Sequence, residues 1–120
     1  MQNYTRLLNH TEDYIENHLD QKITLADVAS NIHMSKYHFH RLFHNYSKET
    51  LYQFVTRIKL ERSAMFLRVR KEISITDIAL RYGYNDAPSY NRAFRRHFGI
   101  TPTAFRKAQD MPSNKDSNHL

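Results

Sequence analysis

The chain has 120 residues, no cysteine, only two glycines, and 18 Lys and Arg against 12 Asp and Glu, a net charge of +6. The absence of cysteine excludes disulfides and thiol chemistry, while two glycines are too few for a glycine-rich phosphate loop or a turn-rich β fold. No apolar run approaches the roughly 20 residues of a membrane span, and the first residues do not resemble a signal sequence, so the composition favours an all-α protein without a membrane partner.

Helix signals along the chain predict about seven helices. An opening helix is expected over about residues 4–18, and a long middle helix from Thr50 to about Leu67. Shorter helices of about eight residues should follow Thr24 and Ser74, because each precedes an Asp by three positions, close to a capping box.

A second helix is expected after each of these short helices, behind a brief break. We expect its N-cap at Ser35 in the first case and at Asp86 in the second. A closing helix should begin at Thr101-Pro102, since the missing N–H of Pro102 costs nothing at the first helical position. Helix, short turn and helix, twice over, is the layout of a helix-turn-helix motif.

The order of elements predicts an all-α, homeodomain-like domain over residues 1–108. Its expected parts are a first helix-turn-helix subdomain over about 5–49, a linker helix over about 50–68 and a second subdomain over about 72–108. The middle helix should pack against both halves through Leu51, Val55, Ile58, Leu60, Met65 and Leu67. Residues 109–120 are polar and indicate a disordered tail or a linker.

The two halves repeat each other in sequence. Residues 24–29 recur as residues 74–79, fifty positions later. Further on the offset is 51, and it pairs Phe39, Arg41, Phe43, Thr50 and Phe54 with Tyr90, Arg92, Phe94, Thr101 and Phe105. The second helices of the two motifs are therefore expected to be equivalent.

Basic charge is concentrated in the middle of the chain. Residues 35–71 hold nine basic and two acidic residues, whereas residues 1–34 hold two basic and five acidic ones. Aromatic residues such as Tyr37 and Phe43 lie among the basic ones. This pattern indicates a nucleic-acid surface, with a solvated basic face that has no partner as the alternative.

A helical wheel of about 100° per residue gives the second helix of each motif a buried and an outer side. Expected on the buried side are Phe39, Leu42, Phe43 and Tyr46, and in the second half Tyr90, Ala93, Phe94 and His97. Expected on the outer side are Tyr37, His40, Arg41 and His44, and in the second half Pro88, Asn91, Arg92 and Arg95. Such side chains suit base edges and thymine methyl groups, so one monomer is expected to read two major-groove segments about 34 Å apart.

Further basic residues are candidates for contacts to DNA phosphates, which anchor a protein without reading sequence. They are Lys36, His44, Lys48, Arg57, Lys59, Arg95 and Arg96. For each of them the alternative is an ordinary solvated charge.

Motifs in a fixed order across residues 5–107 resemble the AraC/XylS family of transcription regulators. They are Lys59-Leu60-Glu61-Arg62-Ser63-Ala64, Ile75-Thr76-Asp77-Ile78-Ala79, Gly83-Tyr84, Tyr90, Arg92, Phe94, Gly99 and Thr101-Pro102. The resemblance implies a seven-helix domain with two helix-turn-helix motifs that binds double-stranded DNA. It also implies an activator that contacts RNA polymerase in the bacterial cytoplasm, associated with the nucleoid. The sequence indicates no cofactor and no small-molecule ligand.

The resemblance also assigns the base-reading residues by position. In the first recognition helix they fall on Tyr37, His40 and Arg41, and in the second on Ala87, Pro88, Ser89 and Arg92. Ala87 and Pro88 carry no side-chain donor, so the second motif is expected to discriminate bases less than the first.

Both glycines of the chain lie at turns where the family usually has glycine in each half. Gly83 and Gly99 correspond to His33 and Lys48 in the first half. If the backbone there needs a positive φ, each non-glycine residue costs about 1 kcal/mol in strain.

The run His38-Phe39-His40-Arg41-Leu42-Phe43 resembles a subgroup in which a gyrase-inhibitor-like effector domain follows this domain. Two interpretations remain open. The chain is either a stand-alone regulator controlled by its abundance, or the leading DNA-binding module of a longer effector-responsive protein that continues after Gln109.

Three other functions fit parts of the sequence less well. His40 and His44 have a spacing that can hold a transition metal, but no Cys or acidic residue shares that face. An enzyme is disfavoured, because Asp27 and Asp77 are explained as helix caps and no nucleophile is paired with a base. RNA binding is disfavoured because A-form RNA hides its major groove from such helices.

Overall fold

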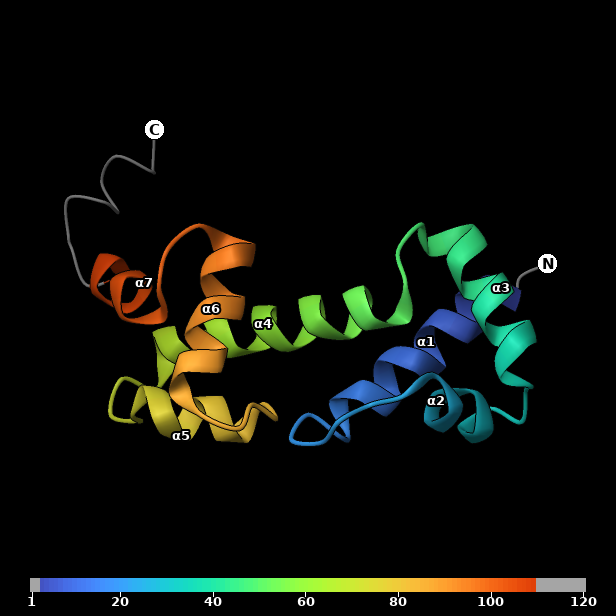
Figure 1. Ribbon diagram of the computed structural model, residues 1–120, viewed down its shortest axis with the longest axis horizontal. Helices are drawn as coiled ribbons and strands as arrows, with labels where there is room; N and C mark the ends of the chain where they lie inside the picture. Colours follow the sequence, from blue (N-terminus) through green and yellow to red (C-terminus); the bar gives the residue numbers. More distant parts are fainter. Residues whose placement is uncertain (1–2, 110–120) are drawn as a thin grey trace. The chain divides into compact units, whose positions relative to one another are not determined.

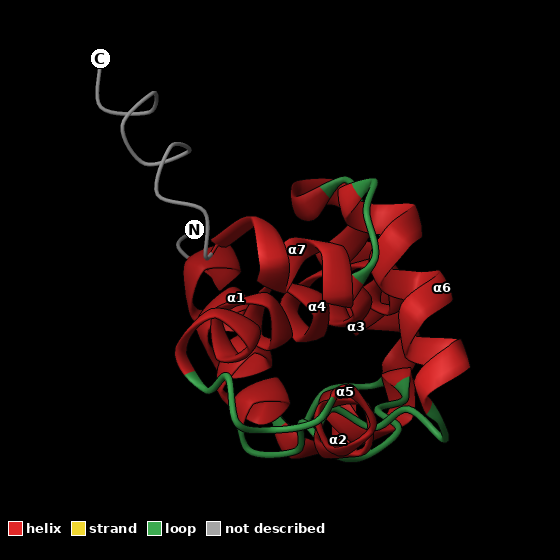
Figure 2. Ribbon diagram, turned by 90° about the vertical axis from the view of Figure 1, so that its left-hand side faces the viewer, coloured by secondary structure: helices red, strands yellow, loops and turns green. Residues whose placement is uncertain are grey.

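The computed structural model describes residues 3–109. This part of the chain consists of helices joined by turns and loops and contains no strand (Figures 1 and 2). Its seven helices are α1 (Asn3–Glu16), α2 (Leu25–Asn31), α3 (Lys36–Ser47), α4 (Leu51–Val69), α5 (Ile75–Arg81), α6 (Ala87–Phe98) and α7 (Pro102–Gln109). The predicted all-α fold is confirmed. The predicted tail lies, from residue 110 onward, outside the described residues. None of the helices described is long and apolar enough to cross a membrane.

Two compact units share the chain, and the boundary between them falls inside α4, between Lys59 and Leu60. In unit 1, α1, α2 and α3 all contact one another. In unit 2, α6 contacts both α5 and α7. Each unit therefore contains one helix-turn-helix pair, α2 with α3 and α5 with α6.

The predicted N-caps fix where the paired helices begin. Thr24 Oγ1 accepts the N–H of Asp27 at 3.1 Å, and the Asp27 carboxylate accepts the N–H of Thr24 at 3.2 Å, which completes a capping box. Ser35, Ser74 and Asp86 each accept the backbone N–H three residues further on. All four predicted caps are confirmed, because a capping signal needs only four consecutive residues to act.

Aromatic rings from α3 and α4 form the centre of unit 1. The rings of Phe39 and Phe43, both fully buried, stack with centroids 5.5 Å apart. Phe54 of α4 meets the Phe43 ring edge-on at 5.2 Å. These contacts fix the buried face of α3, so its opposite face is turned to solvent.

The core of unit 2 combines aromatic packing with a buried polar contact. Tyr90 and Phe94 of α6 are fully buried, and Phe94 meets Phe105 of α7 edge-on at 5.7 Å. The Tyr90 hydroxyl donates to Ser63 Oγ at 2.7 Å, and Ser63 in turn donates to the Leu60 carbonyl at 2.8 Å. Burial raises the pKa of the Tyr90 phenol, since an apolar surrounding disfavours the phenolate.

Three residues predicted to be buried are exposed. Tyr46 has 58% of its surface exposed and stacks on Tyr4 at 4.9 Å, while Met65 is 57% exposed. His97 is also exposed and meets the Phe98 ring edge-on. The helical wheel for α3 and α6, and the expected packing of α4 against both halves, overestimated the buried surface, because neighbouring helices cover only part of each apolar face.

Arg106 of α7 holds the C-terminal end of α4. Its guanidinium donates to the carbonyls of Leu67 at 3.2 Å, Arg70 at 3.0 Å and Ile73 at 2.9 Å. The last carbonyls of a helix have no partner within the helix, and a cation there also suits the helix dipole. Leu67 lies in the last turn of α4, and Arg70 and Ile73 lie in the segment that follows, so one side chain fastens α7 to the end of α4 and to the turn after it.

The structure confirms the backbone conformation expected at both turns of the first half. His33 has φ 57° and Lys48 has φ 64°, close to the values of 88° and 87° at Gly83 and Gly99. A side chain in this left-handed region is strained by contact with the backbone. The first half therefore has the same turns as the second without the residue that suits them best.

We expect His33→Gly and Lys48→Gly each to raise the free energy of unfolding, by up to about 1 kcal/mol, because glycine relieves the strain. Urea denaturation of each single variant measures this. Gly99→Ala is the matched reverse change: an added Cβ meets nothing within 4 Å, so any loss of stability comes from its φ of 87° alone. Lower stability of both glycine variants would show that the strain is negligible.

Candidate nucleic-acid interface

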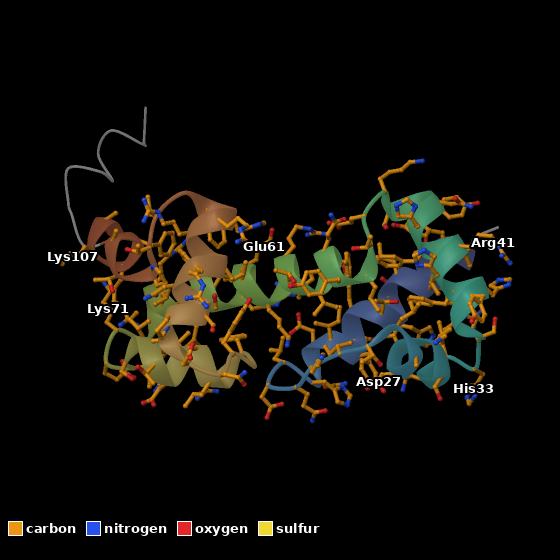
Figure 3. All side chains as sticks on the ribbon, viewed as in Figure 1. Asp27, His33, Arg41, Glu61, Lys71 and Lys107 are labelled. Atoms are coloured by element: carbon orange, nitrogen blue, oxygen red, sulfur yellow. The ribbon has the colours of Figure 1, made fainter. Side chains whose placement is uncertain are left out.

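The outer face of α3 brings the residues predicted for the first half together. Tyr37, His40, Arg41 and His44 follow one another at helical spacing, and all four are exposed, Tyr37 by 74%. Figure 3 shows Arg41 projecting outward from α3, with His33 at the turn before that helix. The buried Phe39 and Phe43 on the other side hold this face outward.

This face is free of negative charge and partly ordered by its own rings. No residue of α3 is acidic. The rings of His40 and His44 stack at 6.1 Å, and Lys36 Nζ lies 5.8 Å from the centre of the Tyr37 ring. Among the described residues, no ion pair or side-chain hydrogen bond engages the Arg41 guanidinium. Arg41 therefore offers its full set of donors to a partner.

On the corresponding face of α6, the side chains already form hydrogen bonds with one another, unlike Arg41 on α3. Arg92 donates to Ser89 Oγ at 3.4 Å, and Asp86 accepts the Ser89 N–H at 2.9 Å. The hydrogen bonds from Ser89, with a smaller contribution from the charge of Arg92, lower the pKa of the Asp86 carboxyl. Pro88 is exposed beside them. A negative charge thus lies near the start of the second recognition helix.

Asn91 does not lie on the outer face where it was predicted. It is half-buried, and its Oδ1 is buried without a hydrogen-bond partner among the described residues. Asn91 precedes the buried Phe94 by three residues, so it shares the edge of the buried face. The placement counts against the base contact predicted for Asn91.

The lowered pKa of Asp86 predicts an acid-sensitive start to α6. Its carboxylate stabilises the folded state at pH values above the ordinary Asp pKa of about 4, and this contribution is lost as the pH falls through the lowered value. Asp86→Asn keeps a capping acceptor but cannot titrate. We expect a smaller drop in melting temperature between pH 6 and pH 3 for this variant than for the parent chain. Equal acid sensitivity of the two proteins would contradict this.

Five of the seven phosphate candidates are exposed. They are Lys36, His44, Lys48, Arg95 and Arg96. Arg57 is instead paired with Glu49, with its Nη2 2.7 Å from the carboxylate. Its charge is therefore already compensated within unit 1.

Lys59 is buried, with 8% of its surface exposed, and its Nζ donates to the Gln21 carbonyl at 2.6 Å. Burial lowers the pKa of Lys59, and the nearby Asp20 offsets this in part. The geometry counts against its predicted phosphate contact. A signal was present in the sequence, because Lys59 follows the apolar Val55 by four residues and so shares its helical face.

No group of three or more His, Asp or Glu side chains that could hold a metal occurs in residues 3–109. His40 and His44 stack side by side on α3. Two imidazoles supply fewer ligands than structural or catalytic metal sites use.

Comparison with known proteins places this arrangement in a family. A profile of a helix-turn-helix domain matches residues 28–108. The probable transcription factor PqrA of Proteus vulgaris is 32% identical over 108 residues, which cover 88% of either chain. A crystal structure of a regulator with an AraC-type DNA-binding domain from Chromobacterium violaceum superposes with a TM-score of 0.82 at 24% identity, over 90% of this chain and 96% of that one. The chain belongs to the AraC/XylS family of transcription regulators.

One relative is much longer than this chain. The transcriptional regulator Rob of Salmonella typhimurium is 32% identical over 97 residues, which cover 81% of this chain and 33% of Rob. The chain thus spans about a third of that relative. The DNA-binding domain of AdpA, solved in complex with a target DNA, shares the fold with a TM-score of 0.75 at 23% identity, over 84% of this chain and 90% of that one. In the present chain, α3 and α6 are the second helices of the two helix-turn-helix motifs.

Proposed function

We propose that this AraC/XylS chain regulates transcription by binding specific double-stranded DNA sequences, with α3 and α6 each in a major-groove segment. The observation that carries the proposal is the outer face of α3. Tyr37, His40 and Arg41 are exposed there together, on a helix without acidic residues. A helix with this face fits the width of the major groove.

In α3, Arg41 is the proposed base reader, because its free guanidinium can donate two hydrogen bonds to guanine O6 and N7. His40 can bond a neighbouring base edge, and the ring of Tyr37 can pack against a thymine methyl. In α6, Arg92 and Ser89 are the proposed readers, with Pro88 as an apolar contact. Since Arg92 already contacts Ser89 near Asp86, we propose that α6 adds less specificity than α3.

Exposed basic side chains on and beside these two helices are the proposed phosphate anchors. They are Lys36, His44, Lys48, Arg95 and Arg96. Each phosphate neutralised releases a counterion, so affinity should fall steeply with salt. The AdpA domain solved with a target DNA supports DNA as the partner.

The proposal extends to the wider role that the family implies. We take the chain to bind DNA as a monomer, and to activate transcription by contacting RNA polymerase within the nucleoid of the bacterial cytoplasm. The names of Rob and PqrA, a transcriptional regulator and a probable transcription factor, support a role in transcription. A second candidate is the DNA-binding module of a longer effector-responsive regulator, which is favoured by the match covering only 33% of Rob.

The test is selection of bound duplexes from a random pool, followed by affinity measurements on the selected site at several salt concentrations. We expect a site with two boxes about one helical turn apart and a log–log salt slope of about −4 at neutral pH, roughly one unit for each anchoring Lys or Arg. A duplex RNA of the same sequence is the control and should compete poorly. Enrichment of one box would show that only one motif reads DNA, and no enrichment would overturn the proposal.

A further inference from the structure

A cavity of about 570 Å³ opens in unit 1, in front of the first helix-turn-helix motif. Its lining comes from α1, from the last residue of α2 with the turn that follows it, and from the first two turns of α3. Its volume lies in the range of sites that hold small organic molecules, which is roughly 300–1,000 Å³. All of its lining residues are within unit 1, so one compact body forms the whole site.

The floor of the cavity is apolar. Leu7 of α1 is buried, and Ile32, Met34 and Leu42 pack against the same core while remaining partly exposed. Partly covered aliphatic side chains and a methionine thioether make an adaptable surface for a flat or chain-like apolar body. The floor alone would accept many apolar molecules.

The rim selects among them by charge. Arg6 and His10 lie one turn apart on α1, His33 stands at the turn, and His38 lies on the first turn of α3. No ion pair or side-chain hydrogen bond between described residues occupies these four side chains. No carboxylate lines the cavity, and Asn31 is its remaining polar residue. An anion therefore meets several donors and no repulsion.

We propose that this cavity binds an organic carboxylate with an apolar body. The carboxylate is held by Arg6 and by the imidazoles of His10, His33 or His38, and the body lies on Ile32, Met34 and Leu42. A guanidinium suits this role because its planar donors match the two carboxylate oxygens. The small-molecule site was not indicated by the sequence, because its parts come from three separate segments.

The bound carboxylate contacts the turn and the first helical turn that position α3. His33 in that turn has a left-handed backbone conformation, with φ 57°. His38 directly follows Tyr37, one of the proposed DNA-contacting residues. Any effect of the ligand on DNA affinity rests on the proposed function. Binding itself does not, so it is measured on the full chain without DNA.

The probe is 2-naphthoate, titrated into the protein by calorimetry and by NMR of backbone amides, with 2-naphthamide as its uncharged match. We expect the naphthoate to bind and the amide to bind at least about tenfold more weakly, because the charge-assisted hydrogen bonds are lost. The backbone amide signals that shift on naphthoate binding should be confined to residues of the cavity, such as Asn31, Ile32 and His33.

Arg6→Gln is the matched variant and should weaken naphthoate binding by about tenfold, whereas Arg68→Gln, an exposed arginine of α4 outside the cavity, should leave it unchanged. Circular dichroism checks that Arg6→Gln remains folded. If it unfolds, His10→Gln replaces it, with a smaller loss expected. No binding at millimolar naphthoate, equal binding of the amide, or shifts located elsewhere would each overturn the proposal.

Discussion

Arg41→Ala is expected to lower affinity for the selected DNA site by about 10- to 100-fold and to relax specificity at one base position. The Arg41 guanidinium has no internal partner in the described chain, so its donors are all available to a base pair. Fluorescence anisotropy on the selected duplex, and on duplexes with each base changed, measures both effects. A loss of affinity that is equal on every duplex would instead assign Arg41 to a phosphate.

Arg92→Ala is the matched change in the second half and should cost less than Arg41→Ala. Arg92 already donates to Ser89 and lies near the Asp86 charge, so DNA must compete with these contacts. Arg68→Ala is the control, as a basic residue that is exposed but not proposed to contact DNA. Equal losses of specificity from Arg41→Ala and Arg92→Ala would contradict the proposed difference between the two motifs.

Arg106→Lys is expected to destabilise the chain by about 2–4 kcal/mol although it conserves the charge. The carbonyls of Leu67, Arg70 and Ile73 accept from three different nitrogens of the guanidinium, whereas a lysine ammonium has one nitrogen, so some of them lose their partner. Because α7 also packs on Phe94 through Phe105, loosening Arg106 weakens the aromatic core of unit 2. Thermal and urea denaturation measure the effect.

Lys107→Gln provides the control for this prediction. Lys107 is the exposed neighbour of Arg106 on α7 (Figure 3) and should change stability by no more than about 0.5 kcal/mol. Hydrogen exchange separates the two units: amides of α6 and α7 should lose protection in Arg106→Lys, while amides of α2 and α3 keep theirs. Full stability of the lysine variant would show that charge alone, and not the planar fork, holds the end of α4.

Local signals carried the fold prediction. A cap depends on a side chain and a backbone N–H three residues apart, so Thr24, Ser35, Ser74 and Asp86 could all be read from the sequence. The sequence repeat aligned the glycines of the second half with residues of the first half, and so predicted a positive φ at His33, which the structure confirms.

Residues whose surroundings come from distant segments were harder to predict. Lys59 shares a helical face with the apolar Val55, which indicates burial, but its hydrogen bond to the Gln21 carbonyl, 38 positions away, follows from no local rule. Asn91 lies at the boundary between the buried face and the outer face of α6, where a small rotation of the helix decides whether its side chain is buried. The cavity beside the first motif depends on α1 lying against the turn at His33, which only tertiary packing determines.

The buried contact between Tyr90 and Ser63 has a consequence for how the two halves can change over time. Phe39, which occupies the position of Tyr90 in the first half, carries no hydroxyl. Loss of Ser63 alone would leave a buried phenol without an acceptor, which costs more than losing both hydroxyls together. Tyr90 and Ser63 should therefore vary as a pair among descendants of this chain, while Phe39 can vary without that constraint. The two halves repeat each other in sequence, but the interior of one cannot replace the interior of the other.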